Sequence, residues 1–192
     1  RTSRVIGVIG DSTFFHSGIT GLADAVFNRS QITVFILDNR STAMTGHQNN
    51  HGTGLRLSGK PAREIEIGEI VKALGVQHFY EINPNDLAGL KALLVKTAAL
   101  EGPVVILAQW PCALLKELPP QDRSKFELPD HTYTVQADKC KKCKKCLALG
   151  CPSISFVPGI GSRIDESTCK GCSLCYQVCP FHAIQKSGDR HV

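Results

Sequence analysis

A cysteine-rich run near the end of the chain occurs twice, and this duplication constrains the fold more than any other feature. The first copy is CKKCKKCLALGCP, at residues 140–152, and the second is CKGCSLCYQVCP, at residues 169–180. The first three cysteines of the two copies have the same spacing, whereas the first copy has one extra residue before its fourth cysteine. In each copy, C-x2-C-x2-C spacing lets one short loop wrap three thiolates around a single metal centre.

The repeated pattern resembles that of ferredoxins with two 4Fe–4S clusters, over about residues 132–188. In that family the fourth cysteine of each run ligates the other cluster. The resemblance therefore implies two crossed quartets, Cys140, Cys143, Cys146 and Cys179 for one cluster and Cys169, Cys172, Cys175 and Cys151 for the other. A pair of four-cysteine zinc sites is the alternative, although such sites favour paired C-x2-C knuckles.

The formal net charge of +5 comes from one group of lysines. The chain has 22 basic and 17 acidic residues, and five of the basic residues lie in or beside the first cysteine run: Lys139, Lys141, Lys142, Lys144 and Lys145. The charges of the rest of the chain balance, so we do not expect the broad basic surface of a nucleic-acid-binding protein. The lysines can favour electron uptake by the first cluster or dock an acidic carrier, and a solvated basic loop is the other interpretation.

The sequence contains no signal-peptide pattern and nothing close to the roughly 18 uninterrupted apolar residues of a membrane helix. Clustered cysteines without a secretion signal favour metal ligands in a reducing compartment, so we expect a cytoplasmic protein. The chain begins with Arg1 and its one methionine is Met44, so we also expect a piece of a longer polypeptide.

Residues 1–109 alternate strand-like apolar runs with helical patterns. Strands are expected at Val5–Ile9, Ile32–Leu37, Val76–Tyr80 and Val104–Leu107, and helices at Gly18–Phe27, Glu64–Leu74 and Asp86–Leu100. This alternation predicts the α/β class, with an open parallel sheet and helices on both faces. The glycine-rich stretch Thr45–Pro61 is expected to be a long loop of the kind that is often functional.

We therefore divide the chain into three regions. Residues 1–109 form an α/β domain that we expect to be incomplete at its N-terminus, and residues 110–131 form a proline-rich linker. Residues 132–192 form a small α+β domain that holds eight of the nine cysteines.

An acidic residue follows the first apolar strand directly. Gly10 and Asp11 come after VIGVI, and Asn39 comes after the second strand. The carboxyl ends of adjacent parallel strands meet at one edge of a sheet, where open α/β sheets bind ligands. Carboxylate and amide oxygens suit octahedral Mg²⁺ that is bound largely through a diphosphate. The sequence therefore predicts a magnesium site at this edge.

The pair Gly10-Asp11, followed after a helix and a strand by Asn39, is similar to the thiamine-diphosphate signature. Together, GDSTFFHSGI and DNRSTAMTGHQ resemble the alpha subunits of the indolepyruvate:ferredoxin oxidoreductase family, in which a thiamine-diphosphate domain is followed by a two-cluster ferredoxin domain. The resemblance covers nearly the whole chain, as the C-terminal portion of such a subunit. It implies that Asp11, Asn39 and the carbonyl group of Ser41 bind the metal.

Further positions are expected to contact the cofactor. These are Gly10, Ser12, Thr45 and Gly46, where Ser12 replaces the usual glycine of the signature and Gly46 allows close approach of the backbone. His16 and His47 are the candidate catalytic residues, since a histidine can orient a carboxylate or move a proton.

The resemblance implies CoA-dependent oxidative decarboxylation of an aryl pyruvate such as indolepyruvate, with electrons passing through two 4Fe–4S clusters to ferredoxin. The upstream part of the same subunit and a second, beta subunit are the implied partners. Phe14 and Phe15 supply an aromatic surface for the substrate, unless both belong to the core. The alternative function is a non-enzymatic electron-transfer module for which residues 1–109 serve only as a docking domain.

Overall fold

The computed structural model describes residues 4–115, 118 and 122–189. The chain forms two compact units, Arg1–Phe126 and Glu127–Val192. The division between them falls inside the stretch 110–131 that the sequence predicts to be a linker, and the part of this stretch before Glu127 belongs to the first unit.

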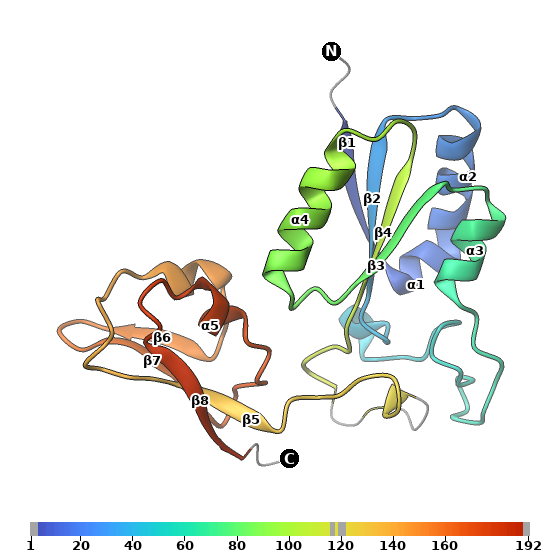
Figure 1. Ribbon diagram of the computed structural model, residues 1–192. Coiled ribbons are helices and arrows are strands. Elements are labelled where there is room, and N and C mark those ends of the chain that lie inside the picture. The colour runs from blue at the N-terminus through green and yellow to red at the C-terminus, as the bar shows by residue number, and fades with distance from the viewer. Residues whose placement is uncertain (1–3, 116–117, 119–121, 190–192) are drawn as a thin grey trace. The chain divides into compact units, whose positions relative to one another are not determined.

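The first unit is built on a parallel sheet of four strands (Figure 1). The strands are β1 (Val5–Gly10), β2 (Ile32–Asp38), β3 (His78–Ile82) and β4 (Val104–Gln109), in the order β1-β2-β4-β3. β4 is an interior strand, and its residues from Val104 to Ala108 are all buried. Such continuously apolar strands are typical of parallel sheets that are covered on both faces.

Helices cover both faces of the sheet. α2 (Ile19–Phe27) and α3 (Ile67–Ala73) lie on one face and α4 (Leu87–Ala98) lies on the other (Figure 1). This arrangement follows from right-handed crossovers, because the chain moves in one direction from β1 to β3 and then reverses to place β4. The predicted fold class is confirmed.

The starts of two elements differ most from the sequence prediction. The helix predicted to begin at Glu64 begins at Ile67, because Glu66 has an extended backbone and the carboxylate of Glu64 forms ion pairs. Gly75 then adopts a left-handed conformation with φ of 85° behind α3, and the strand begins at His78.

The main core lies between the sheet and α2 and α3. Its buried residues are Phe14, Leu22, Ile36, Ile67, Val71, Val105 and Leu107. Phe14 belongs to η1 (Phe14–Gly18), a short π-helical segment between α1 (Asp11–Thr13) and α2. The chain therefore turns from β1 into a helix without a loop, and this turn fixes Asp11 at the carboxyl end of the strand.

The edge strand β1 is poorly covered. Its side chains Val5, Ile6 and Val8 are 59%, 59% and 65% exposed, respectively. Exposed apolar side chains therefore lie on both faces of this strand, whereas the strands of parallel sheets are normally buried on both faces.

Over its described residues, the second unit contains two antiparallel strand pairs and two short helical segments. β5 (His131–Val135) pairs with β8 (Ile184–Asp189), and β6 (Ile154–Val157) pairs with β7 (Gly161–Ile164). The helical segments η4 (Lys145–Leu149) and α5 (Leu174–Val178) each begin within a cysteine run. The predicted small α+β unit is therefore present.

The sequence duplication is also visible in the backbone of the two cysteine loops. Lys142 and Gly171 occupy equivalent positions of the two runs and have φ angles of 55° and 69°. Lys144 and Ser173 are likewise equivalent and have φ angles of 61° and 65°. Both loops thus make the same two left-handed turns around their cysteine triplets.

Candidate functional site

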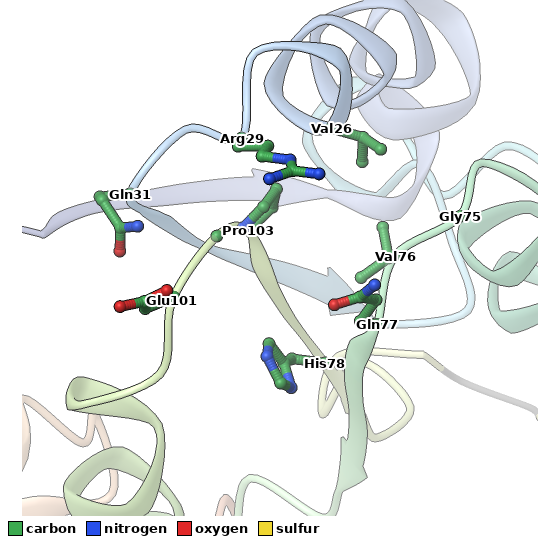
Figure 2. Close-up of a pocket in the computed structure, with 10 residues that line it drawn as sticks. Val26, Arg29, Gln31, Gly75, Val76, Gln77, His78, Glu101 and Pro103 are labelled. Carbon is green, nitrogen blue, oxygen red and sulfur yellow. The ribbon is translucent and has the colours of Figure 1, made fainter.

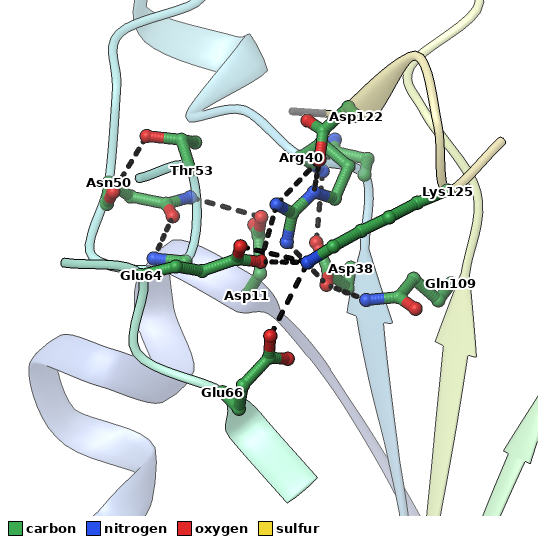
Figure 3. Close-up of polar contacts among 12 residues, drawn as sticks. Asp11, Asp38, Arg40, Asn50, Thr53, Glu64, Glu66, Gln109, Asp122 and Lys125 are labelled. Carbon is green, nitrogen blue, oxygen red and sulfur yellow. Dashed lines mark hydrogen bonds and ion pairs between the residues drawn. The ribbon is translucent and has the colours of Figure 1, made fainter. Parts of the chain in front are cut away.

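Asp11 lies at the carboxyl edge of the sheet, where β1 and β2 end side by side. Its side chain is buried, and its two oxygens accept hydrogen bonds from the Ser12 backbone N–H at 2.7 Å and from Asn50 Nδ2 at 3.0 Å (Figure 3). Burial raises the pKa of Asp11 to about 6, and the nearby negative charge of Asp38 contributes to the shift. A raised pKa is the expected property of a buried carboxylate that has no cation beside it.

Asn39 and Ser41 follow β2 at the same edge. The Asn39 Oδ1 atom accepts a hydrogen bond from the Ser41 backbone N–H at 3.1 Å, and Ser41 is buried. Among the described residues, no donor is hydrogen-bonded to the carbonyl oxygen of Ser41. The edge thus offers carboxylate, amide and carbonyl oxygens, and this donor set fits a Mg²⁺ ion that also binds a diphosphate.

The remaining predicted cofactor positions surround this edge. An added Cβ at Gly10 would meet no heavy atom within 4 Å, so the backbone there is open to close approach. Gly46 has a φ of 114°, which favours glycine, and Thr45 Oγ1 donates to Gln48 Oε1 at 2.6 Å.

A cavity of about 540 Å³ opens beside Asp11. Its walls include Ser12, His16, Thr45, Asn50 and His51. The His16 and His51 rings meet edge to face with centroids 5.5 Å apart. Since Asn50 is both a cavity wall and a hydrogen-bond donor to Asp11, the cavity and the predicted metal site are contiguous.

The two histidines predicted to be catalytic have different surroundings. His16 lines the cavity, whereas the cavity wall does not include His47, whose Nδ1 lies 3.3 Å from the Ser41 hydroxyl. Phe14 is 1% exposed and belongs to the core, so of the two alternatives stated for this residue the core holds and the substrate surface does not. Phe15 is half-buried and packs against the His51 ring.

A buried cluster of charges adjoins Asp38 and was not predicted from the sequence. The Arg40 guanidinium donates to Asp122 Oδ1 at 2.7 and 3.0 Å and to Glu64 Oε1 at 2.8 Å (Figure 3). It also lies 3.5 Å from Asp38 Oδ2, which accepts a 2.7 Å hydrogen bond from Gln109. Burial opposes the charge of Arg40, but the hydrogen bond to Asp122 and the charge of Asp38 outweigh it, so the pKa of Arg40 lies above its ordinary value.

Lys125 extends this cluster toward solvent. Its ammonium group lies 2.7 Å from Glu64 Oε1 and 3.3 Å from Glu66 Oε1. Burial would raise the pKa of Glu64, but the hydrogen bonds from Lys125 and Arg40 hold it below its ordinary value. The segment that carries Asp122 and Lys125 is therefore fixed against the loop that carries Arg40.

The first cysteine triplet surrounds a small cavity in the second unit. Cys140, Cys143, Cys146 and Cys179 all line it. A Cβ added to Gly161, whose φ is 127°, would lie 3.0 Å from the Cys140 sulfur, so the backbone of β7 packs directly against this group. The fourth cysteine of the second run thus lies with the first triplet.

The second triplet lies beside Cys151. Burial and the neighbouring thiolates of Cys172, Cys169 and Cys151 raise the pKa of Cys175 to about 12. Burial and the charges of Cys151 and Cys169 also raise the pKa of Cys172. The structure therefore brings each triplet together with the fourth cysteine of the other run. In the described part of the chain, no three His, Cys, Asp or Glu side chains are arranged to hold a single metal ion.

A second cavity of the first unit, of about 420 Å³, lies at the amino ends of the strands (Figure 2). It is lined by the segments that lead into β2, β3 and β4, including Gln31, Gln77, His78 and Pro103. Asp11 follows the carboxyl end of β1. Because the strands are parallel, this cavity and Asp11 lie at opposite ends of the strands, and the cavity is separate from the candidate cofactor site.

The comparison with known families identifies the first unit. The C-terminal TPP binding domain of thiamine pyrophosphate enzymes matches residues 1–108, which is more than half of the chain. The chain therefore belongs to the thiamine pyrophosphate enzymes that contain this domain. The 4Fe-4S binding domain matches residues 162–185, where the second cysteine run lies.

Several curated relatives of the chain are indolepyruvate oxidoreductase subunits. The IorA subunit of Pyrococcus abyssi is 40% identical over 184 residues, which are 95% of this chain and 28% of the relative. The IorA subunit of Thermococcus kodakarensis is 39% identical over 189 residues, which are 96% of this chain and 29% of the relative. The predicted resemblance is confirmed, and the chain spans less than a third of the length of these relatives.

A shorter match to another curated protein covers about a quarter of the chain. Hydrogenase-4 component A of Escherichia coli is 44% identical over 55 residues, which are 26% of this chain and 27% of that protein.

Among the described residues, none of the helices has the length and apolar character that a membrane crossing requires.

Proposed function

We propose that this chain is the cofactor-binding and electron-exit part of a 2-oxo acid:ferredoxin oxidoreductase that acts on aryl pyruvates such as indolepyruvate. The whole enzyme would decarboxylate the 2-oxo acid oxidatively, transfer the acyl group to coenzyme A and pass electrons through two 4Fe–4S clusters to ferredoxin. The upstream part of the subunit and a beta subunit complete it, and the assembly is cytoplasmic.

One observation carries this proposal. A single chain combines an oxygen-rich edge of a thiamine-diphosphate-binding sheet with two crossed cysteine quartets. An electron-transfer module with only a docking domain has no need for the buried carboxylate of Asp11, because burial of a carboxylate that has no ion pair among the described residues raises the free energy of the folded chain.

The residues at the sheet edge have distinct roles in this proposal. Asp11, Asn39 and the Ser41 carbonyl group bind Mg²⁺, and Gly10 lets the backbone approach the diphosphate. Thiamine diphosphate supplies the carbanion chemistry that releases carbon dioxide from a 2-oxo acid. His16, on the cavity wall, orients the carboxylate of the substrate or moves a proton. His47 holds Ser41 in place through a contact of its ring nitrogen Nδ1 with the Ser41 hydroxyl group.

The charges around the cavity bear on the substrate. Arg40 is buried among carboxylates and is not available to a second carboxylate of a substrate. Arg56 and Arg63 line the cavity, where they can bind the single carboxylate of an aryl pyruvate or the anionic groups of coenzyme A. Leu55, Leu57 and Ile65 provide an apolar wall. With Phe14 in the core, the aryl preference depends mainly on the similarity to the IorA subunits.

The test uses the complete enzyme, assembled from the full-length subunit and its partner subunit under anaerobic conditions. With coenzyme A and a viologen acceptor, kcat/KM should be higher for indolepyruvate and phenylpyruvate than for pyruvate and 2-oxoglutarate. A preference for either of the last two would overturn the substrate assignment. An assembly that contains iron and sulfide but binds no thiamine diphosphate would overturn the enzyme proposal and favour the electron-transfer module.

A further inference from the structure

Five lysines surround the first cysteine triplet and form a lysine collar, which consists of Lys139, Lys141, Lys142, Lys144 and Lys145. We propose that electrons leave the protein from the cluster inside this collar, and that the collar docks an acidic protein electron carrier. This inference rests on the proposed function and assigns the exit to one of two clusters that the duplicated sequence makes otherwise equivalent.

The collar is confined to one of the two repeats. At the five equivalent positions, the second repeat has Thr168, Lys170, Gly171, Ser173 and Leu174. Asp165 and Glu166 precede the second triplet, so the one lysine there is accompanied by two carboxylates. The two cysteine loops share a backbone conformation but differ strongly in charge. Since the second loop adopts this conformation with one lysine at these five positions, the loop conformation does not require the lysines.

The collar is also accessible. All five of its lysines are exposed, and Cys143, which lies between them in the chain, is the one exposed cysteine among the eight of the two runs. None of the ion pairs formed among the described residues involves a collar lysine. The positive charge is therefore available to a partner, and the partner can approach the cluster closely there.

Two collar lysines occupy backbone positions that ordinarily favour glycine. Lys142 and Lys144 have positive φ angles, and the residue equivalent to Lys142 in the second repeat is Gly171. Their side chains are fixed, since Lys142 Nζ donates to the Gly159 carbonyl and Lys144 Nζ lies 4.5 Å from the centroid of the Phe156 ring. Lysine at a position where glycine fits better indicates that the charge itself is required.

Positive charge near a cluster stabilises its reduced form, which carries one more negative charge. The collar lysines would therefore favour reduction of a cluster held by the first triplet over one held by the second triplet. A carrier docked at the collar would take up one electron there and be reduced, and no bond or proton would be exchanged. Complementary charge brings the carrier to this exit and raises the rate of association.

The test compares two triple variants of the complete enzyme. The collar variant is Lys139→Gln with Lys141→Gln and Lys145→Gln, which leaves the fixed lysines Lys142 and Lys144 in place. The control is Arg163→Gln with Lys170→Gln and Lys186→Gln, which removes the same charge from the same unit.

With an acidic two-cluster ferredoxin as acceptor, the collar variant should raise KM roughly tenfold and lose most of its dependence on ionic strength. The control should change KM less than twofold, and both variants should keep their activity with a viologen. An equal effect of the two variants, or no effect of either, would overturn the collar as the docking surface. If the unaltered enzyme itself shows no activity with the viologen, the proposed function is refuted instead.

A second measurement needs no variant. Zero-length carbodiimide coupling of the unaltered enzyme to the same ferredoxin joins lysine amines to carboxylates at the contact surface. The coupled peptides should contain the collar lysines. Coupling at Lys170 or Lys186 in their place would show that the carrier docks elsewhere on the unit and would overturn the proposal.

Discussion

Replacing Arg40 with methionine tests the buried charge cluster beside the candidate cofactor site. The side chain of Arg40 is 2% exposed, and its partners Asp38, Asp122 and Glu64 are 4%, 0% and 19% exposed. Removal of one partner from a buried ion pair costs about 3–5 kcal/mol, because the other charge stays buried without compensation. We expect a loss of this size from the free energy of unfolding of the first unit.

The distribution of contacts shows where the loss arises. Without Arg40, Glu64 keeps Lys125 and Asp38 keeps the amide of Gln109. Asp122 loses the hydrogen bonds to its Oδ1 atom, and its Oδ2 atom already has no partner among the described residues. The penalty should therefore come mainly from Asp122. The double variant with Asp122→Leu as well should be more stable than Arg40→Met alone, because no uncompensated charge stays at that position.

The assay is anaerobic thermal unfolding of the chain, followed by circular dichroism for the first unit and by visible absorption for the clusters. A loss of about 3–5 kcal/mol should lower the Tm of the first unit by about 10 °C or more, with little change in the absorption transition. Lys72→Met is the control, since the Lys72–Glu69 pair is exposed, and it should leave the Tm unchanged. A Tm for Arg40→Met equal to that of the control would refute the reasoning, as would a double variant less stable than the single one.

Two further predictions concern the cofactors. Asp11→Ala removes a carboxylate that we expect to bind Mg²⁺, so the assembled enzyme should lose thiamine diphosphate on gel filtration and keep its iron. The control variant Asp24→Ala, at an exposed position, should keep both the cofactor and the iron. If Asp11→Ala retains the cofactor, Asp11 is a turn residue and not a metal ligand. Cys151→Ser should reduce the iron content from about eight to about four atoms per chain and remove the electron paramagnetic resonance signal of the cluster at Cys169, Cys172 and Cys175, because the fourth ligand comes from the other run. Loss of the signal of the first triplet's cluster would contradict the crossed arrangement.

Local patterns were sufficient to predict the sheet, its helices and the place of Asp11. The alternation of apolar runs with amphipathic stretches specifies βαβ units, and their handedness then brings the ends of β1 and β2 together. The spacing of the cysteines predicted each triplet, whereas the fourth member of each quartet came from the resemblance to two-cluster ferredoxins. The sequence thus contains those parts of the site that depend on regular geometry.

The charge cluster could not be predicted, because its members have no local relation. Arg40 and Asp122 are far apart in the chain, and each is an ordinary charged residue of a loop in the sequence. The same cluster explains two further differences. It fixes Glu64 outside α3, and it holds Asp122 and Lys125 within the first unit although they belong to a stretch with the composition of a linker.

Phe14 shows a different limit. An aromatic residue three positions after a candidate metal ligand can face the ligand or the core, and the helical turn that begins directly at Asp11 decides between them. This turn directs Phe14 under the sheet, where it contacts Phe15 edge to face and joins the main core. The sequence alone did not specify that β1 passes into a helix without a loop.

The exposed strand β1 has a consequence for how this polypeptide behaves at high concentration. An uncovered edge of a sheet presents backbone donors and acceptors to any other extended chain, and the bare side chains of Val5, Ile6 and Val8 add apolar adhesion. Pairing of such edges between copies leads to precipitation, and nothing at this edge, neither proline nor lysine within Val5–Gly10, opposes it. Colloidal stability of the chain therefore depends on a protein surface that covers β1.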